Sequence, residues 1–247
     1  MFPVSHYSSR KLVKVCGNRY PEDAWRVAAC RPDFMGWIFS PRSRRRIPLE
    51  LATRLIAMIR RTHPQIRHVG VLAGNSVPEI RDLIRRGPGL DFLQIVDGPG
   101  LIAALEGARG RNSERRNSLA VLNSLNLPRI PRIPPILPVI RVRDQLRDSD
   151  LTAKYGDRPL WLMDSYVPGQ PGGTGRRFAP ELVSELRRPF LLAGGLNEHN
   201  VREALEASGA RGADVSSGIE YPGCPGRKDP DRLLQFVQAV RGPGFSL

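Results

Sequence analysis

Apolar and polar positions alternate along the chain in the way that is typical of repeated strand and helix units. Short apolar runs, which predict buried strands, are each followed by a segment with apolar residues at helical spacing. The first unit is the clearest, with an apolar run at 12–16, a turn at Gly17 and Asn18, and a helix from Pro21 to Ala29. Repetition of this pattern predicts parallel strands joined by helices.

Eight such units can be counted. The other predicted strands are 34–39, 68–73, 90–96, 136–142, 159–164, 190–193 and 213–215, and the helices after them are expected at 48–61, 77–86, 101–107, 144–155, 179–186, 201–208 and 229–240. Eight parallel strands suit either a closed barrel or a doubly wound open sheet. The strand count, the length of 247 residues and the absence of an early G-x-G-x-x-G favour the barrel. We therefore predict an α/β fold, a single-domain (β/α)8 TIM barrel over residues 11–247 after a short N-terminal extension at 1–10.

One stretch does not fit the repeat. Residues 108–134 carry six arginines and one glutamate, and prolines recur from Pro128 to Pro135. This composition predicts a solvated insertion with extended character. We expect a tolerated surface loop, and an arm that binds a partner is the alternative.

Composition limits the class of protein. Apolar residues make up 40% of the chain, with 24 glycines and 23 prolines, which permits a sizeable core and excludes a fibrous or mostly disordered chain. No apolar stretch approaches the roughly 18 residues that span a bilayer, and the first residues lack a secretory signal. We expect a cytoplasmic protein with no membrane partner. Cys16, Cys30 and Cys224 are too few for a disulfide framework and lack metal-ligand spacing, so we expect free thiols and no metal site.

The net charge of +14 raises the question of nucleic-acid binding. Only four of the 38 basic residues are lysines, and the arginines are spread along the chain without interleaved aromatic residues. We therefore expect no specific nucleic-acid partner. A basic surface would instead attract polyanions weakly and steer a small anionic substrate.

Polar residues gather at the carboxyl ends of the predicted strands, where barrels of this kind place their active sites. Cys16 ends the first strand and is either a functional thiol or a small buried apolar residue. Asp164 ends the sixth strand and Asp214 lies within the eighth. Burying a carboxylate costs free energy unless it has an ion-pair partner or a role in the chemistry, so each is a candidate site residue. The alternative is that each caps the following turn. Arg45 in the second loop can pair with an anion, although charge alone does not separate it from the arginines beside it.

Two small-residue clusters follow the last two strands. They are Gly194 and Gly195 in one loop, and Ser216, Ser217 and Gly218 in the next. Either cluster alone is common turn chemistry. Together, after the seventh and eighth strands, they predict a phosphate site, because barrels frequently bind phosphate there through loop amides.

In these segments the sequence resembles the phosphoribosylanthranilate isomerase family, (β/α)8 enzymes of tryptophan biosynthesis. The matching stretches follow the family's order and cover most of the chain outside the first ten residues and 97–158. They are KVCGNRYPEDA (14–24), GWIFSPRSRR (36–45), HVGVLAGNS (68–76), LDFLQI (90–95), LMDSYVPGQPGGTGRRF (162–178), LLAGGLNEHNVREAL (191–205) and ADVSSGIEYPGCPGRKD (213–229).

The resemblance implies an isomerase that needs no metal or organic cofactor. Its Amadori rearrangement opens the ribose ring of N-(5'-phosphoribosyl)anthranilate and yields 1-(2-carboxyphenylamino)-1-deoxyribulose 5-phosphate. By the same resemblance, Asp164 would be the general acid at the ring oxygen and Cys16 the general base at C2'. Arg45 would hold the anthranilate carboxylate, with Asp214 helping to orient this part of the site. The implied sites for the ribose phosphate are the amides around Gly194, Gly195, Ser217 and Gly218. The implied partner is a small phosphorylated substrate, and the implied assembly is a monomer or homodimer.

The chain departs from the family pattern at the fourth strand end, where Q-L-H-G is replaced by QIVDG at 94–98 and no His is present. Two alternatives to the isomerase remain. A related histidine-pathway isomerase performs the same rearrangement with paired aspartates, against which Cys16 argues. A barrel that has lost catalysis or changed specificity would act as a phosphosugar-binding or scaffold protein, against which the joint presence of Cys16, Arg45 and Asp164 argues.

Overall fold

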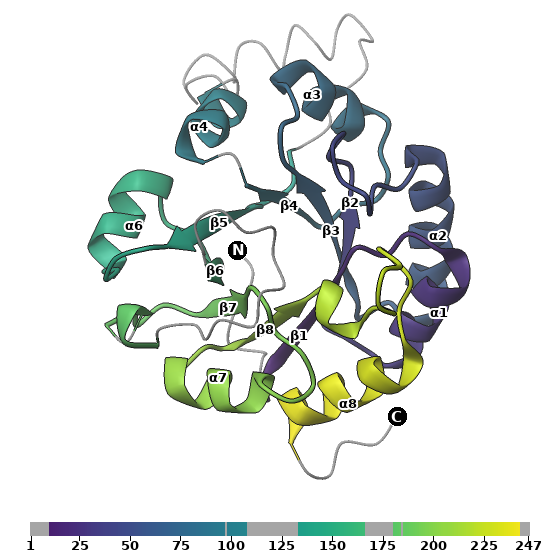
Figure 1. Cartoon of the computed structure of the whole chain (residues 1–247). Coiled ribbons are helices and arrows are strands. Elements are labelled where there is room, and N and C mark those ends of the chain that lie inside the picture. The colour runs from purple at the N-terminus through teal and green to yellow at the C-terminus, as the bar shows by residue number, and fades with distance from the viewer. Residues whose placement is uncertain (1–9, 97, 108–132, 166–179, 184, 243–247) are drawn as a thin grey trace, which may run out of the picture.

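Eight parallel strands close into a barrel, and the helices pack around its outside (Figure 1). The computed structural model describes residues 10–96, 98–107, 133–165, 180–183 and 185–242. Each strand pairs with the next in chain order, and β8 pairs with β1 to close the sheet. The predicted single-domain (β/α)8 barrel is confirmed.

The element bounds follow the predicted order closely. The strands are β1 (Leu12–Cys16), β2 (Phe34–Ile38), β3 (Arg67–Leu72), β4 (Phe92–Ile95), β5 (Ile136–Val142), β6 (Trp161–Ser165), β7 (Phe190–Ala193) and β8 (Gly212–Val215). The helices are α1 (Pro21–Ala29), α2 (Leu49–Thr62), α3 (Val77–Arg85), α4 (Pro99–Gly107), α6 (Asp148–Tyr155), α7 (Val201–Ser208) and α8 (Pro230–Arg241), with 3-10 helices η2 (Pro180–Val183) and η3 (Ser217–Ile219). Every strand lies within two residues of its predicted bounds.

The prediction was less accurate in the fifth and sixth units. The helix expected from residue 144 begins at 148, because the Leu146 N–H donates to the Leu182 carbonyl and leaves the helical path. The helix expected at 179–186 is one 3-10 turn among the described residues, and the Leu186 N–H bonds the Val183 carbonyl three residues back. Residues 108–132 of the insertion predicted at 108–134, Asp97 and most of the 162–178 motif lie outside the described residues.

The barrel interior is apolar at the amino-terminal end of the strands and polar at the other end. The apolar plug consists of Leu12, Phe34, Val69, Phe92, Leu137, Val139, Leu162, Leu191 and Ala193, of which Ala193 lies at the carboxyl end of β7. Phe34 and Phe92 meet edge to face inside it, with ring centroids 5.9 Å apart. Because side chains alternate along a strand, the residues two positions after this plug point into the barrel near its carboxyl-terminal mouth. The chemistry is therefore confined to that mouth.

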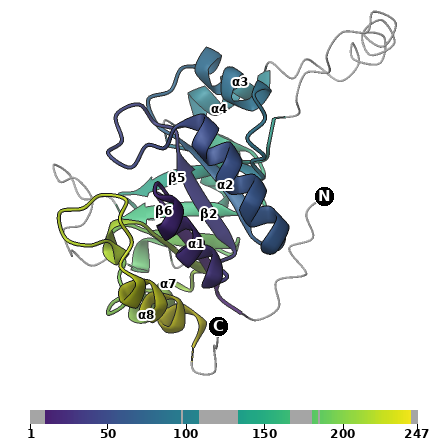
Figure 2. The same ribbon diagram turned by 90° about the vertical axis from the view of Figure 1, so that its right-hand side faces the viewer.

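The helices cover the outer face of the barrel with apolar stripes. In α2, the residues Leu55, Ile56 and Ile59 recur at helical spacing and are buried against the strands. Figure 2 shows α2, α1 and α8 around one side of the barrel. At the start of α3, Ser76 and Glu79 bond each other's main-chain N–H in a capping box, which fixes the point where the helix begins. No helix among the described residues has both the length and the apolar content to cross a membrane.

A buried carboxylate ties the chain together at the amino-terminal end of the barrel. Asp33, 4% exposed, accepts hydrogen bonds from the Val13 N–H at 2.8 Å and from Arg241 at 2.8 Å, and pairs with Arg10 at 2.6 Å. These contacts join β1, the start of β2 and the end of α8. Asp33 and its partners lie at the opposite end of the strands from the mouth, so their contacts stabilise the fold.

We expect Asp33→Asn to lower the free energy of unfolding by on the order of 2–4 kcal/mol, because it removes the buried carboxylate charge that pairs with the Arg241 guanidinium. Urea unfolding at neutral pH measures the loss. Glu185→Gln is the matched control, since it breaks an exposed pair with Arg147 and should cost less than about 1 kcal/mol. Equal losses in the two variants would contradict the structural role of Asp33.

Candidate active site

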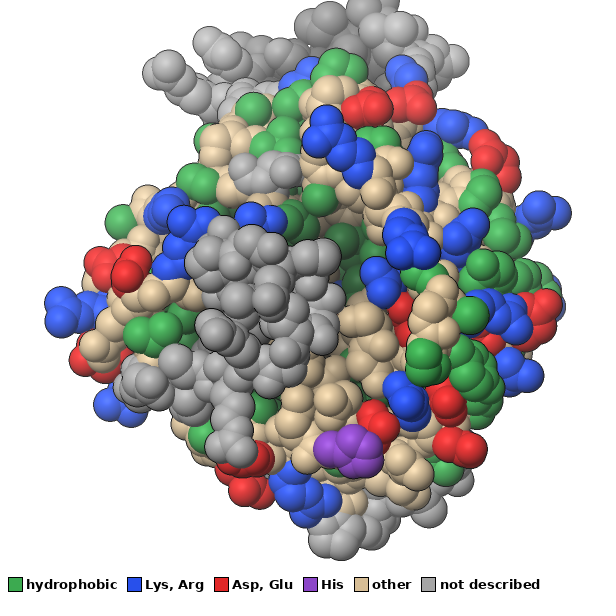
Figure 3. Space-filling model, in the orientation of Figure 1, with side chains coloured by type: hydrophobic (Ala, Val, Ile, Leu, Met, Phe, Trp, Pro, Cys, Tyr) green, Lys and Arg blue, Asp and Glu red, His purple; other side chains and the backbone are tan. Residues whose placement is uncertain are grey.

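Among the described residues, five ionisable side chains point into the barrel mouth from four strands. They are Lys14 and Cys16 of β1, Arg141 of β5, Asp164 of β6 and Asp214 of β8. In β1, β5 and β6 these residues lie an even number of positions from a plug residue, so they share its inward face. In β8, Asp214 shares the face of Gly212. In the sheet register Lys14 lies opposite Asp214, and Arg141 opposite Asp164. In this view of the mouth, Lys and Arg side chains lie above and to the right of a central hollow with a hydrophobic floor (Figure 3). The mouth therefore suits an anionic ligand with an apolar part.

Lys14 and Asp214 form a buried ion pair across the seam between β1 and β8. The ammonium nitrogen lies 2.9 Å from a carboxylate oxygen, and the Lys14 side chain has no exposed surface. Burial alone would lower the pKa of Lys14, but Asp214 and Cys16 beside it raise the pKa above its ordinary value. Asp214 is thus paired, as a buried carboxylate has to be. The sequence analysis did not select Lys14, although a lysine two residues before Cys16 in an apolar strand shares its face.

The Cys16 thiol lies just above this pair. It is buried next to Ile38 and Val71, and it needs the glycine at position 36, where an added Cβ would lie 2.7 Å from the sulfur atom. Burial raises the pKa of the thiol, and Asp214 adds to the rise. The ammonium groups of Lys14 and Lys228 act in the opposite direction. The structure thus places Cys16 inside the mouth as a protonated thiol with two cations nearby.

Asp164 is a carboxyl group with an unusual affinity for its proton. Burial and the nearby Asp214 carboxylate raise the pKa of Asp164 to about 6, and Arg141 opposes them. A carboxyl group with such a pKa can hold and give up a proton near neutral pH. The geometry therefore supports a proton-transfer role at the end of β6.

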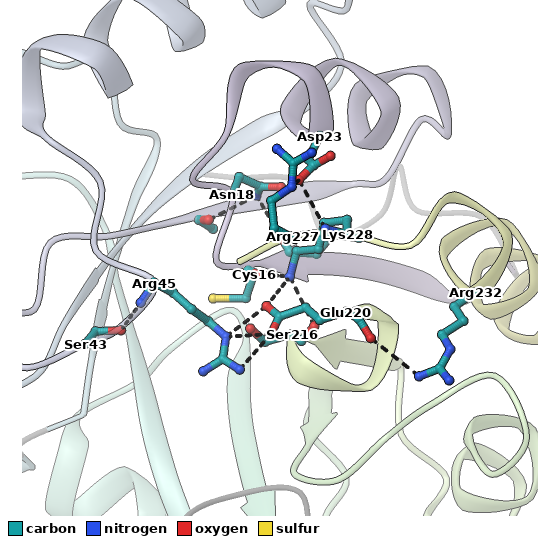
Figure 4. Close-up of polar contacts among 12 residues, drawn as sticks. Cys16, Asn18, Asp23, Ser43, Arg45, Ser216, Glu220, Arg227, Lys228 and Arg232 are labelled. Carbon is teal, nitrogen blue, oxygen red and sulfur yellow. Dashed lines mark hydrogen bonds and ion pairs between the residues drawn. The ribbon is translucent and has the colours of Figure 1, made fainter. Parts of the chain in front are cut away.

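Arg45 is distinguished from the other arginines of its loop by its surroundings. Arg42, Arg44 and Arg46 are exposed, whereas Arg45 is 27% exposed and turns toward the mouth. Its guanidinium binds Glu220 through Nε at 2.8 Å and through Nη2 at 2.7 Å (Figure 4). Within the part of the chain that the structure describes, Nη1 makes no hydrogen bond. The arginine that charge alone could not select is therefore the one held at the site.

The loops after β7 and β8 come together, as the joint cluster predicts. A Cβ on Gly218 would lie 1.9 Å from the Leu196 carbonyl oxygen, so only glycine permits this approach. Asn200 donates to the Gly195 carbonyl at 3.0 Å and holds the first loop. The Ser216 hydroxyl oxygen is buried, and none of the described residues bonds it. Gly194, Gly195, Ser216, Ser217 and Gly218 therefore border one region of the mouth.

The structure brings the predicted site residues to one end of the barrel and adds three that were not selected from the sequence. These are Lys14, Glu220 and Lys228, all buried and all in ion pairs. Cys30 packs among the core residues and Cys224 is exposed, so neither belongs to the site.

The chain is similar in sequence and in structure to known isomerases. A sequence profile described as N-(5'-phosphoribosyl)anthranilate (PRA) isomerase matches residues 127–239. The N-(5'-phosphoribosyl)anthranilate isomerase of Desulforudis audaxviator is 33% identical over 236 residues, covering 93% of this chain and 98% of its own. The phosphoribosyl anthranilate isomerase structure from Thermotoga maritima superposes with a TM-score of 0.71 at 26% identity, covering 93% of this chain and 98% of that chain. A related isomerase structure in complex with reduced 1-(o-carboxyphenylamino)-1-deoxyribulose 5-phosphate gives a TM-score of 0.67 at 25% identity, covering 93% and 98%.

We expect Asp164→Asn to stabilise the protein in a pH-dependent way. The pKa of Asp164 rises from 3.8 to about 6 on folding, so the ionised carboxylate costs stability, increasingly from about pH 4 to about pH 6 and constantly above that. The amide removes this cost. The variant should be more stable at pH 7.5 by on the order of 1–3 kcal/mol, with no gain at pH 4. Urea unfolding at both pH values measures the difference, and an equal gain at both would contradict the titration.

Proposed function

This chain belongs to the N-(5'-phosphoribosyl)anthranilate isomerase family, and we propose that it performs the Amadori rearrangement with Asp164 as general acid and Cys16 as general base. The proposal rests on the presence of two proton-transfer groups on the inner face of the barrel mouth. One is a carboxyl with a pKa raised to about 6, and the other is a buried thiol beside two ammonium groups. A proton donor and a proton acceptor are what this reaction needs.

The first step opens the ribose ring. Asp164 gives its proton to the furanose ring oxygen while the anthranilate nitrogen donates its lone pair to C1', so the C1'–O bond breaks and an iminium cation forms. The raised pKa of Asp164 favours this transfer, because near neutral pH a larger fraction of this acid carries its proton than of an ordinary aspartic acid. Asp214 forms an ion pair with Lys14, and its negative charge contributes to the raised pKa of Asp164.

The second step removes the proton from C2'. The Cys16 thiolate takes this proton, the C–H electrons form the C1'–C2' double bond, and the iminium nitrogen becomes neutral. The enol then loses its hydroxyl proton while C1' gains one, which gives the ketone product. Burial raises the pKa of Cys16, but the iminium cation beside it would favour the thiolate as Lys14 and Lys228 do.

Two anion sites would hold the ends of the substrate. Arg45 Nη1 is available for the anthranilate carboxylate, and Asp214 helps to orient the site through Lys14 and Cys16. Gly194, Gly195, Ser217 and Gly218 supply main-chain amides for the phosphate, and the buried Ser216 hydroxyl would gain a partner there. The bound ligand of the related isomerase carries both a carboxyphenyl group and a phosphate, which supports this division.

We expect Cys16→Ala and Asp164→Asn each to lower kcat by on the order of 10²–10⁴, because each removes one proton-transfer group. The assay generates N-(5'-phosphoribosyl)anthranilate in situ and follows the loss of its fluorescence after the purified protein is added. Cys224→Ala is the matched thiol control and should keep the parent rate, since the Cys224 side chain is exposed on the 220–228 hairpin and takes part in none of the site contacts described. Parent-level turnover by either folded site variant would overturn the assignment, and a folded parent without turnover would overturn the function.

A further inference from the structure

Two buried side chains, Glu220 and Lys228, lie between Cys16 and Arg45. The roles above use Lys228 only as a cation near the thiol, and they do not use Glu220. Figure 4 shows them at the centre of a network that joins the end of β1, the loop after β2 and the segment after β8. The main chains of Glu220 and Lys228 pair in an isolated antiparallel bridge, so both side chains start from one short hairpin. The hairpin is anchored to α1, because the Lys228 N–H donates to Asp23 at 3.1 Å.

Lys228 uses all three of its ammonium protons inside the protein. Its nitrogen lies 2.7 Å from the Cys16 carbonyl oxygen, 3.1 Å from the Ser216 carbonyl oxygen and 3.0 Å from a Glu220 carboxylate oxygen. The side chain has no exposed surface. An ammonium has three donors, so this environment satisfies it completely and fixes its position. Lys228 therefore links the main chain at the ends of β1 and β8 to the Glu220 carboxylate.

Glu220, held by Lys228, in turn holds the Arg45 guanidinium. Its Oε1 accepts from Lys228 at 3.0 Å and from Arg45 Nε at 2.8 Å, and its Oε2 accepts from Arg45 Nη2 at 2.7 Å. Burial acts to raise the pKa of Glu220, but Arg45 and Lys228 keep it below its usual range. The Glu220 side chain is 4% exposed, whereas the side chain of the Arg45 that it holds is 27% exposed. Only the Arg45 end of the network thus faces the mouth.

We propose that Glu220 is a positioning residue for the isomerase reaction: anchored by Lys228, it fixes the Arg45 guanidinium relative to Cys16, so that a substrate carboxylate bound at Arg45 brings C2' to the thiol. This inference rests on the proposed function. A bidentate carboxylate holds a guanidinium plane in one orientation, which a single contact would not do. Because the Arg45 guanidinium is held in place before the substrate binds, the free energy of substrate binding is not reduced by the entropy cost of ordering this side chain.

The charge of the network also defines the ligand class. Arg45 and Lys228 contribute two positive charges and Glu220 one negative charge, so these three residues together carry a net charge of +1. This balance matches one carboxylate rather than a phosphate dianion. Arg45 would therefore select the aromatic acid end of the substrate, while the phosphate binds at the loops after β7 and β8.

Glu220→Gln tests the role of Glu220. We expect KM for N-(5'-phosphoribosyl)anthranilate to rise about tenfold while kcat falls by less than about threefold, because the loss is in substrate positioning at Arg45. The Kd of the reduced product analogue, measured by calorimetry, should rise by a similar factor, and the Kd of inorganic phosphate should not change. Asp33→Asn is the matched control, since an equally buried carboxylate at the far end of the barrel should lower stability and leave KM unchanged.

A double-mutant cycle separates action through Arg45 from a general effect. If Glu220 acts through Arg45, adding Glu220→Gln to Arg45→Ala should raise KM no further than Arg45→Ala alone. Should Glu220→Gln fail to fold, Glu220→Asp keeps the charge with a shorter reach, and the same KM increase is expected from it.

The outcomes are distinct. An unchanged or lower KM in folded Glu220→Gln would overturn the proposal, and a lower KM would mean that Glu220 competes with the substrate for Arg45. A parent that turns over no substrate but binds the analogue, with weaker binding in Glu220→Gln, would overturn the proposed reaction and keep the positioning role. A parent that binds no analogue would overturn both.

Discussion

The pairing of β1 with β8 is the contact on which the rest of the site depends. It joins strands 200 residues apart in the sequence and sets Lys14 against Asp214 inside the barrel. A buried ion pair gains little net stability, because removing both charges from water offsets their attraction. Its consequence here is local: it places a fixed cation under the Cys16 thiol and a fixed anion near Asp164. The closure of the barrel thereby determines the electrostatics of its mouth.

The two proposed catalytic groups rest in the protonation states opposite to those they need. At neutral pH the raised pKa of Cys16 favours the thiol, and a pKa of about 6 leaves most of Asp164 ionised. The reactive form, with a thiolate and a protonated carboxyl, is then a minor fraction of the free protein. Because the substrate passes through an iminium cation, its positive charge would stabilise the thiolate when it is needed. The site in this account gains its reactivity from the bound substrate as well as from its own cations.

The sequence predicted the barrel well because apolar runs of four to seven residues mark strands buried on both faces. Cys16 and Asp164 could be chosen because they end predicted strands, whereas only the family resemblance separated Arg45 from the arginines beside it. Glu220 and Lys228 could not be chosen in this way, because their importance lies in contacts with residues far away in the sequence. Lys14 carried a signal, as a charged residue in an apolar strand on the face of Cys16. The short turn at 180–183 was missed because Leu182 bonds a residue of another unit.

The pH dependence of kcat/KM for N-(5'-phosphoribosyl)anthranilate tests the central claim most directly. If Asp164 is the acid and Cys16 the base, the parent profile should rise up to about pH 6, stay level, and fall above the raised pKa of the thiol. Asp164→Asn should lose the lower break, so that its residual activity rises continuously toward the pKa of Cys16. A lower break that persists unchanged in Asp164→Asn would contradict the account.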